Sequence, residues 1–268
     1  QRKKYVDTLL LEIDDFYKGE PLKTLYIGGG TPSLLEIKDL QRILYCFNYD
    51  PSCEITIEIN PETVDFEYLK KLKDTGFNRI SIGIQSFNDE ILKAIGRIHN
   101  ASRALQTVIA AKKAGFDNIN ADFIYGLPNQ TIDDFVNDLR TIEQTGVTHI
   151  SLYGLKIEEG CKFFENMPEN LADDDLQADM YLAAIDTLEN AGYEHYEISN
   201  FAKKGFESRH NLNYWNDGEY YGFGAAAHGY IGGVRYSNFC DLKDYEKKYD
   251  SKEFLEALNK QERLEETI

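Results

Sequence analysis

The sequence has 268 residues, of which 42% are hydrophobic and 28% are charged, as in globular proteins with one large or two small domains. The formal net charge is −17, from 29 Lys and Arg against 46 Asp and Glu. This acidic excess disfavours binding to nucleic acid or to an anionic membrane, because both need clustered positive charge. No apolar run reaches the roughly 18 residues of a membrane-spanning helix. We therefore expect no nucleic-acid partner and no membrane span.

The cysteines and the chain ends indicate the setting of the protein. Cys46, Cys53, Cys161 and Cys240 show no CxxC spacing, and a long acidic chain is unlike a disulfide-dense secreted scaffold. We expect buried free thiols in a reducing, cytoplasmic protein, with a Cys46–Cys53 pair as the alternative. The sequence begins with Gln1 in a segment that is already helical and ends without a helix cap, so we expect it to be part of a longer protein.

Short apolar runs alternate with amphipathic segments up to residue 198. The expected strands are Lys23–Ile27, Glu54–Ile59, Arg79–Ile84, Asn118–Ile124, His149–Tyr153 and Tyr193–Ile198. The expected helices are Val6–Lys18, Glu36–Phe47, Phe66–Asp74, Asp89–Ile95, Ser102–Ala114, Ile132–Gln144 and Asp174–Asn190. Four of these helices are followed by a stop-signal glycine and then a strand: Gly76, Gly115, Gly146 and Gly192. This repetition predicts an α/β fold with a parallel sheet or barrel.

The composition changes after about residue 200. Glycine and aromatic residues dominate from Phe201, and a short polar helix is expected at Asp241–Tyr249. We therefore predict two domains, a βα array over residues 1–200 and a small β-rich extension of antiparallel strands and loops over residues 201–268.

Polar groups or bare backbone follow four of the predicted strands. They are Gly28–Thr31, Glu58, Gln85 and Asp122. In parallel βα architectures, ligands bind at the carboxyl ends of the strands. Each residue alone is commonly a turn residue, but four strand ends in register favour one shared site.

The residue types at these strand ends suit a ligand with an amino-acid end and a nucleoside end. The backbone of Gly29 and Gly30, with Thr31, suits a carboxylate or ammonium group. Three side chains can hydrogen-bond to ribose hydroxyls: Glu58, Gln85 and Asp122. Arg97 can pair with a carboxylate in fork geometry. S-adenosylmethionine is such a ligand, whereas GGGTPS does not match the GxGxxG dinucleotide fingerprint.

Several stretches carry a family resemblance from about Lys23 to Tyr249: YIGGGTPSLL, EINPETV, ISIGIQSFND, IGRIHN and NADFIYGLP. They resemble the radical S-adenosylmethionine enzymes of the oxygen-independent coproporphyrinogen III oxidase family. The resemblance implies a partial (β/α)6 barrel, of which the sequence supplies five strands and lacks the first. It also implies a cofactor site, in which Gly30 and Thr31 meet the methionyl end, Arg97 its carboxylate, Gln85 and Asp122 the ribose, and Glu58 completes the site.

The same resemblance implies a [4Fe–4S] cluster held by a CxxxCxxC loop after the first barrel strand. This sequence contains no such spacing. We therefore expect the cluster cysteines to lie upstream, and we expect the chain alone to bind no cluster and to carry out no radical chemistry. No catalytic residue is assigned.

A second motif, HNLNYW at residues 210–215, resembles the heme-chaperone branch of this family. His210 suits an axial iron ligand, and Tyr214 and Trp215 suit an apolar wall for a porphyrin. The alternative is that His210 is a hydrogen-bonded structural histidine and Trp215 a core residue.

Three functions are therefore weighed. The first is a heme chaperone that binds heme or porphyrin and S-adenosylmethionine and delivers heme to acceptor proteins. The second is an oxygen-independent coproporphyrinogen III oxidase of porphyrin biosynthesis, and the third is a metabolic βα enzyme whose glycine loop binds phosphate. The HNLNYW motif favours the first.

Overall fold

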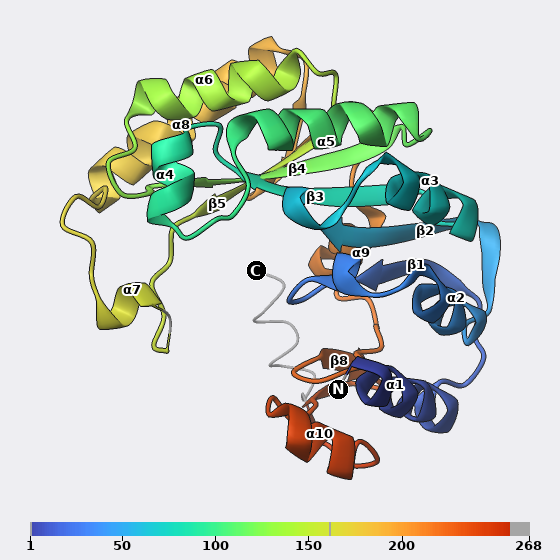
Figure 1. Ribbon diagram of the computed structural model, residues 1–268. Coiled ribbons are helices and arrows are strands. Elements are labelled where there is room, and N and C mark those ends of the chain that lie inside the picture. The colour runs from blue at the N-terminus through green and yellow to red at the C-terminus, as the bar shows by residue number, and fades with distance from the viewer. Residues whose placement is uncertain (1, 161, 258–268) are drawn as a thin grey trace. The chain divides into compact units, whose positions relative to one another are not determined.

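The computed structural model describes residues 2–160 and 162–257 and contains two β-sheets (Figure 1). The large sheet has the strand order β1-β2-β3-β4-β5-β7-β6, and the small sheet has the order β10-β9-β8. The strands are β1 (Leu22–Ile27), β2 (Tyr49–Ile59), β3 (Arg79–Gln85), β4 (Asn118–Tyr125), β5 (His149–Gly154), β6 (Glu194–Glu197), β7 (Asn200–Ala202), β8 (His228–Ile231), β9 (Val234–Ser237) and β10 (Phe254–Ala257).

One or two helices follow each strand up to residue 190. They are α1 (Arg2–Phe16), α2 (Ile37–Tyr45), α3 (Phe66–Thr75), α4 (Asp89–Ala94), α5 (Ala101–Lys113), α6 (Ile132–Glu143), α7 (Lys162–Glu165), α8 (Asp174–Asn190), α9 (Arg209–Trp215) and α10 (Leu242–Lys248), with short 3-10 turns η1 (Pro32–Leu34) and η2 (Pro61–Thr63). The predicted α/β fold is confirmed, and the five predicted barrel strands correspond to β1–β5.

The chain forms two compact units that interleave along the sequence. The first unit comprises residues 1–25, 35–54 and 208–268, and the second comprises residues 26–34 and 55–207. The division into 1–200 and 201–268 stays a prediction about domain boundaries.

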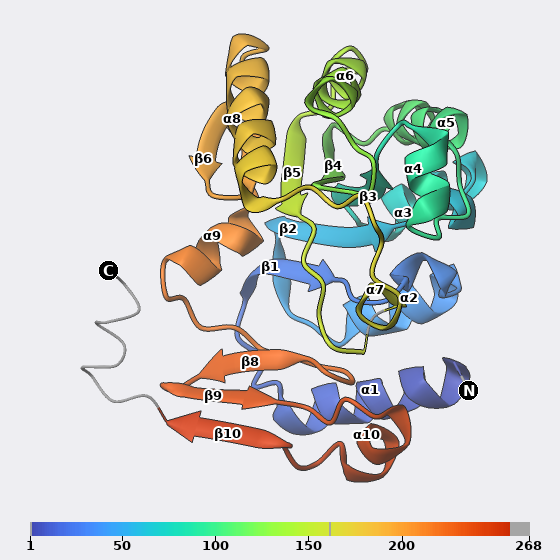
Figure 2. The same ribbon diagram turned by 90° about the vertical axis from the view of Figure 1, so that its left-hand side faces the viewer.

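The second unit is built on parallel strands with one apolar and one polar face. Strands β2 to β5 pair in parallel with their sequence neighbours. Successive side chains of a strand point to opposite faces. The apolar face is fully buried, and α3, α5 and α6 lie along the sheet (Figures 1 and 2). The other face carries Thr56 and Glu58 on β2, Arg79 and Ser81 on β3, Asn120 and Asp122 on β4, and His149 and Ser151 on β5.

Helix ends follow the chemistry read from the sequence. Helices α3, α4, α5, α6 and α8 begin at side-chain caps, which satisfy backbone N–H groups that have no partner inside the helix. The caps are Asp65, Asn88, Asn100, Thr131 and Asp173. The four predicted stop glycines all have positive φ angles, which L-residues rarely adopt. The βα boundaries are therefore set by local sequence.

The far edge of the large sheet differs from the prediction. The strand expected at Tyr193–Ile198 is present as β6, but the antiparallel strand β7 lies between it and β5. Strand β7 has only three residues, which is too short to show a hydrophobic period in the sequence.

The prediction of antiparallel strands and loops after residue 200 is wrong for the HNLNYW motif. This motif lies in helix α9, which begins at the Ser208 cap, where the hydroxyl oxygen accepts from the Asn211 N–H. Strands β8 and β9 do form an antiparallel hairpin (Figure 2), and its turn residues Gly232 and Gly233 have φ angles of 62° and 76°. Paired positive φ angles are typical of a two-residue hairpin turn.

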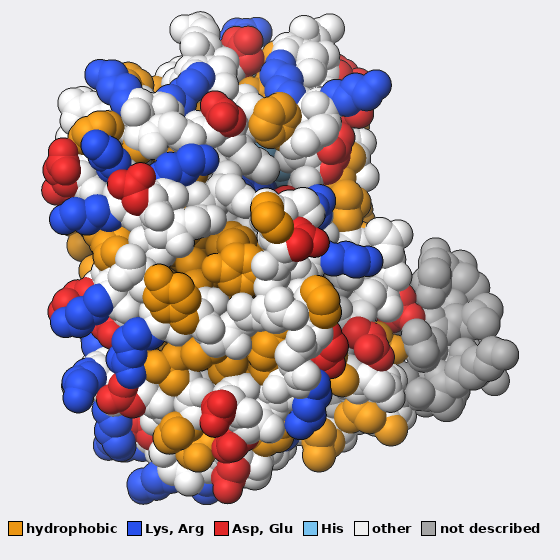
Figure 3. Space-filling view, turned by 90° about the vertical axis from the view of Figure 1, so that its right-hand side faces the viewer, with side chains coloured by type: hydrophobic (Ala, Val, Ile, Leu, Met, Phe, Trp, Pro, Cys, Tyr) orange, Lys and Arg blue, Asp and Glu red, His pale blue; other side chains and the backbone are white. Residues whose placement is uncertain are grey.

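Three cysteines lie among the described residues, and all are free thiols. Only Cys53 is buried, and its burial raises the pKa of the thiol to about 11. Cys161 lies outside the described residues. In the part of the chain that is described, no helix is both long enough and apolar enough to cross a membrane. On the face drawn in Figure 3, Lys and Arg are interspersed with Asp and Glu.

A buried carboxylate connects distant segments of the first unit. Glu12 of α1 is fully buried and accepts hydrogen bonds from the Gly224 N–H at 2.8 Å and from Asn238 Nδ2, Tyr245 OH and Lys252 Nζ, each at 2.7 Å. All four donors come from the carboxyl-terminal part of the chain. Because the carboxylate is paired and hydrogen-bonded, its burial is tolerated.

We expect Glu12→Ala to lower the free energy of unfolding by about 3–5 kcal/mol, because it leaves Lys252 buried without its carboxylate. Urea unfolding followed by circular dichroism measures this change. The control is Asp14→Ala, an exposed acid on the same helix, which we expect to change stability by less than about 0.5 kcal/mol. Equal effects of the two substitutions would contradict the role given to Glu12.

Candidate functional site

The second unit contains a cavity of about 400 Å³ at the carboxyl ends of its strands. This volume falls in the range of small-molecule sites. The lining residues are Tyr26, Gly30, Thr31, Pro32, Glu58, Ile59, Asn60, Ser81, Gly83, Gln85, Arg97, Asp122, Ile124 and Tyr153. Six of the seven residues predicted to bind an adenosyl amino acid are in this set: Gly30, Thr31, Glu58, Gln85, Arg97 and Asp122. Gly29 is adjacent in sequence but does not line the cavity.

The three glycines after β1 form a tight loop against the Glu58 side chain. A Cβ on Gly28 would lie 2.6 Å from a ring carbon of Tyr26 and 2.7 Å from Glu58 Oε1, so a larger residue would push these two side chains away. Gly29 and Gly30 have φ angles of 79° and 59°. The Gly29 N–H donates to Glu58 Oε2 at 2.9 Å, and Tyr26 OH donates to Oε1 at 2.8 Å. The loop therefore closes onto a carboxylate of the protein itself.

Arg97 supplies the positive charge of the cavity. Its Nη2 donates to the Gly83 carbonyl at 2.7 Å and to Asn60 Oδ1 at 3.0 Å, and Asn60 Nδ2 donates to Thr31 Oγ1 at 3.3 Å. Gly83 permits this approach, because a Cβ there would lie 2.9 Å from Nη2. Burial lowers the pKa of the guanidinium. Its Nε is buried without a hydrogen-bond partner among the described residues, which suits an anionic ligand group.

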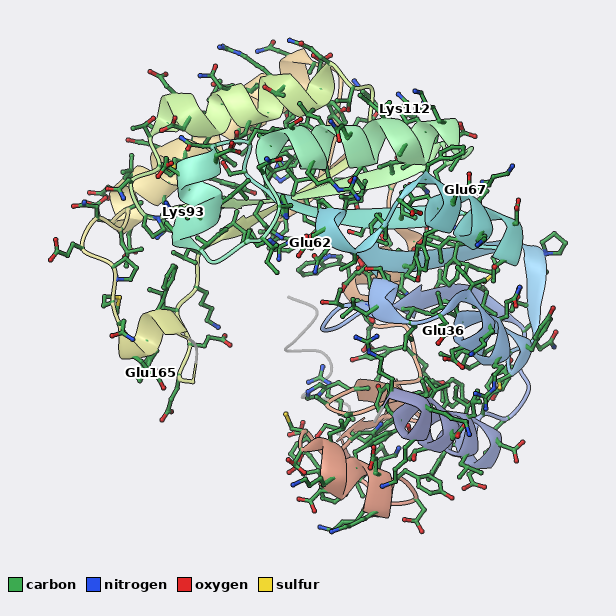
Figure 4. The ribbon with its side chains drawn as sticks, viewed as in Figure 1. Glu36, Glu62, Glu67, Lys93, Lys112 and Glu165 are labelled. Atoms are coloured by element: carbon green, nitrogen blue, oxygen red, sulfur yellow. The ribbon has the colours of Figure 1, made fainter. Side chains whose placement is uncertain are left out.

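Arg97 lies in the connection between α4 and α5, beyond the end of the predicted helix Asp89–Ile95. Gly96, with a φ angle of 74°, ends the helical path before it. His99 anchors this connection through Nδ1 to Glu62 Oε2 and Nε2 to the Ile84 carbonyl, each at 3.1 Å. Glu62, labelled in Figure 4, lies in η2 between β2 and α3. The connection is therefore held at both the end of β3 and the end of β2.

Asp122 supplies a half-buried carboxyl group on the polar face of the sheet. Ser81 Oγ donates to its Oδ2 at 2.8 Å, and Asn120 Nδ2 donates to its Oδ1 at 2.7 Å. Desolvation by burial raises the pKa of Asp122 to about 6, against the lowering effect of the Ser81 hydrogen bond, and the nearby Glu58 charge raises it further. Asp122 therefore titrates close to neutral pH.

Gln85 has an unusual backbone at the end of β3. Its φ angle is 72°, and the pairing of β3 with β4 shifts register between Gly83 and Gln85. Non-glycine residues with positive φ are uncommon, and they cluster at functional sites. Gln85 lines the cavity next to this irregularity.

The predicted heme-contacting residues lie elsewhere, on α9 in the first unit. His210 Nδ1 is 2.8 Å from Thr24 Oγ1, and Nε2 is 2.7 Å from Tyr214 OH. Tyr214 and Trp215 are 46% and 57% exposed, so Trp215 is not a core residue. Both ring nitrogens of His210 are hydrogen-bonded in this arrangement, so iron ligation through Nε2 requires the Tyr214 hydroxyl to move away.

Four further polar or aromatic residues line the cavity and were not predicted from the sequence: Tyr26, Asn60, Ser81 and Tyr153. Strand alternation would have found Ser81, which shares a face with Gly83, and Tyr26, which lies two residues before Gly28. Asn60 directly follows β2, in the position used to select the other site residues.

The described residues provide no metal centre. No group of three His, Cys, Asp or Glu among residues 2–160 and 162–257 is arranged to hold a metal ion. The cysteines at positions 46, 53, 161 and 240 do not have CxxxCxxC spacing. The residues of this sequence therefore do not fit a [4Fe–4S] cluster.

Comparisons with known proteins place these features in context. A model of the radical SAM superfamily matches residues 1–142. The chain is 40% identical to a protein of Lactococcus lactis named heme chaperone HemW, over 98% of this chain and 72% of that protein. It is 42% identical to the heme chaperone HemW of Haemophilus influenzae, over 82% and 58% of the two chains, and 39% identical to that of Escherichia coli, over 85% and 62%. The chain thus spans 58–72% of the length of these relatives.

Solved structures share the fold. The coproporphyrinogen III oxidase HemN of Escherichia coli, described as a radical SAM enzyme, aligns with a TM-score of 0.87 at 24% identity, over 98% of this chain and 66% of that chain. The Elp3 protein of Methanocaldococcus infernus aligns with a TM-score of 0.51 at 19% identity, over 70% and 49%. These likenesses confirm the partial radical-SAM-type barrel with a small antiparallel sheet.

We expect stability to depend on pH through Asp122. In the folded state the pKa of Asp122 is about 6, whereas the ordinary pKa of an aspartate is 3.8. Between these two pH values the folded state therefore binds more protons than the unfolded state. The free energy of unfolding then falls as pH rises, by up to about 3 kcal/mol for this group. Urea unfolding of wild type and Asp122→Asn from pH 4 to pH 7 isolates this contribution. A difference between the two proteins that does not vary with pH would contradict the assignment.

Proposed function

The chain belongs to the radical SAM superfamily and, within it, to the family of the proteins named heme chaperone HemW, and on this premise we propose that it binds S-adenosylmethionine and heme and delivers heme to acceptor proteins. One observation carries the cofactor part of the proposal. A single cavity is lined by Arg97, whose Nε has no hydrogen-bond partner among the described residues, and by the carboxyl groups of Glu58 and Asp122, which can accept hydrogen bonds from hydroxyls.

In the proposed arrangement, the ligand carboxylate pairs with Arg97, and the ribose hydroxyls donate to Asp122. Thr31 and Gln85 add polar contacts at the cavity wall, and Glu58 completes the site for the ammonium group or a hydroxyl. The Gly29 N–H already donates to Glu58, so the glycine loop acts by shaping the cavity around that carboxylate.

The radical chemistry of the superfamily needs a cluster that this sequence has no ligand set to hold, so no radical step is derived for these residues. What the described residues do is bind and orient. Arg97 fixes one end of the ligand by charge, Asp122 fixes another by hydrogen bonds, and the buried polar face keeps both groups in place.

Helix α9 is the proposed heme contact. Its exposed aromatic side chains, Tyr214 and Trp215, offer an apolar surface on which a porphyrin can stack. His210 is the proposed iron ligand, after its Nε2 exchanges the Tyr214 hydroxyl for iron.

The alternatives have less support. Coproporphyrinogen III oxidase activity rests on fold likeness at 24% identity, whereas the relatives near 40% identity are named heme chaperones. A phosphate site is disfavoured because two carboxyl groups, Glu58 and Asp122, line the cavity and would repel the anion.

We expect Arg97→Met to weaken binding of S-adenosylhomocysteine by about 10- to 100-fold, because the hydrogen bonds of a charged pair are lost. Binding of 5′-methylthioadenosine, which lacks the amino-acid end, is expected to stay within twofold. Isothermal titration calorimetry measures both. The control Lys93→Met removes the same charge from an exposed site on α4 (Figure 4) and leaves both affinities unchanged. Loss of both ligands in Arg97→Met would contradict the assigned role.

For heme, we expect His210→Ala to weaken binding and to change the Soret band. Tyr214→Phe is expected to tighten binding by about fivefold, because the iron no longer has to displace the Tyr214 hydroxyl from Nε2 of His210. Spectrophotometric titration with hemin measures both, with His228→Ala, an exposed histidine on β8, as the control. Identical spectra of wild type and His210→Ala would remove His210 as the iron ligand.

A further inference from the structure

We propose that Asn120 is a positioning residue that makes the cavity selective for ligands with an intact ribose diol, by orienting the Asp122 carboxylate. The inference rests on the proposed binding of an adenosyl ligand and names the group that gives that site its sugar selectivity. Asn120 does not line the cavity and is only 3% exposed, so it acts through Asp122.

The geometry begins with strand β4. Asn120 and Asp122 are two residues apart, so both side chains lie on the polar face. Asn120 Nδ2 donates to Asp122 Oδ1 at 2.7 Å and to Ser81 Oγ at 2.7 Å, and Ser81 Oγ donates to Asp122 Oδ2 at 2.8 Å. Each carboxylate oxygen is thus held by one protein donor. The remaining lone pairs are left for the two adjacent hydroxyls of a ribose.

The orientation of the Asn120 amide is itself fixed from the next strand. Its Oδ1 lies 2.6 Å from His149 Nδ1. Ser151 Oγ, which is 2.5 Å from Asn200 Oδ1, lies 3.1 Å from the same Asn120 oxygen. His149 is fully buried, and desolvation lowers the pKa of its ring well below the usual value, so the ring is neutral. Tyr196 OH lies 2.7 Å from Nε2. When Tyr196 donates to Nε2, the proton of the ring is on Nδ1 and donates to the Asn120 oxygen.

With this tautomer of His149, the hydrogen bonds run in one direction, from Tyr196 through His149 and Asn120 to Asp122. A flipped Asn120 would place its oxygen against the Asp122 carboxylate, which can only accept when ionised. The amide N–H therefore points to Asp122. Removing it leaves Asp122 with one donor fewer and free to rotate or to take up a proton, either of which removes an acceptor from the diol.

The test compares two ligands on the full chain. S-adenosylhomocysteine carries the diol, and its 2′,3′-dideoxy analogue lacks it but keeps the base and the amino-acid end. We expect wild type to prefer the diol ligand by about tenfold or more, as expected for hydrogen bonds to a charged group. Asn120→Leu, which keeps the approximate shape, should lower the affinity for S-adenosylhomocysteine about tenfold and leave the affinity for the analogue within twofold.

The matched control is Asn118→Leu. Asn118 begins β4, and its side-chain oxygen has no hydrogen-bond partner in the described part of the chain, so the same substitution there should keep the wild-type preference. Circular dichroism checks that each variant is folded. If Asn120→Leu does not fold, Asn120→Asp, which replaces the donor by an acceptor, is expected to lose the diol preference in the same way.

The outcomes separate this inference from the proposed function. Equal loss of both ligands in a folded Asn120 variant, or an unchanged diol preference, would overturn the positioning role while the cofactor site stands. Wild-type binding of S-adenosylhomocysteine without diol preference would overturn it as well. No binding of either ligand to wild type would overturn the proposed cofactor site and this inference with it.

Discussion

The half-buried carboxyl group of Asp122 is the constraint on which the cavity depends. A carboxyl group with little access to water needs donors, and Ser81 and Asn120 supply them. Those donors need partners in turn, which is why the same face carries His149 and Ser151 rather than apolar side chains. One face of the parallel sheet is therefore an apolar core and the other a hydrogen-bonded polar layer beneath the cavity.

The remaining cavity residues complement this carboxyl group with opposite charge and close backbone approach. Gly83 leaves room for the Arg97 guanidinium, and Gly28 leaves room for the Tyr26 ring and the Glu58 carboxylate. The connection that carries Arg97 is fixed by His99. The cavity is thus preorganised, which lowers the cost of fixing a flexible ligand with charged ends.

Much of this arrangement could be predicted from the sequence, because local patterns determine it. Strand ends β1–β4, the stop glycines and six cavity residues follow from hydrophobic period and turn chemistry. What failed depends on tertiary contacts or on very short segments. Strand β7 has only three residues, and the aromatic content of α9 favoured strands in its place. The role of Asn120 needs distances across three strands, which no local pattern contains.

A crystal structure of the chain with S-adenosylhomocysteine tests the central claim most directly. The account predicts one ligand molecule in the cavity, with its carboxylate on Arg97 and its ribose hydroxyls on Asp122. A ligand bound away from these residues, or with its ribose turned away from Asp122, would contradict it.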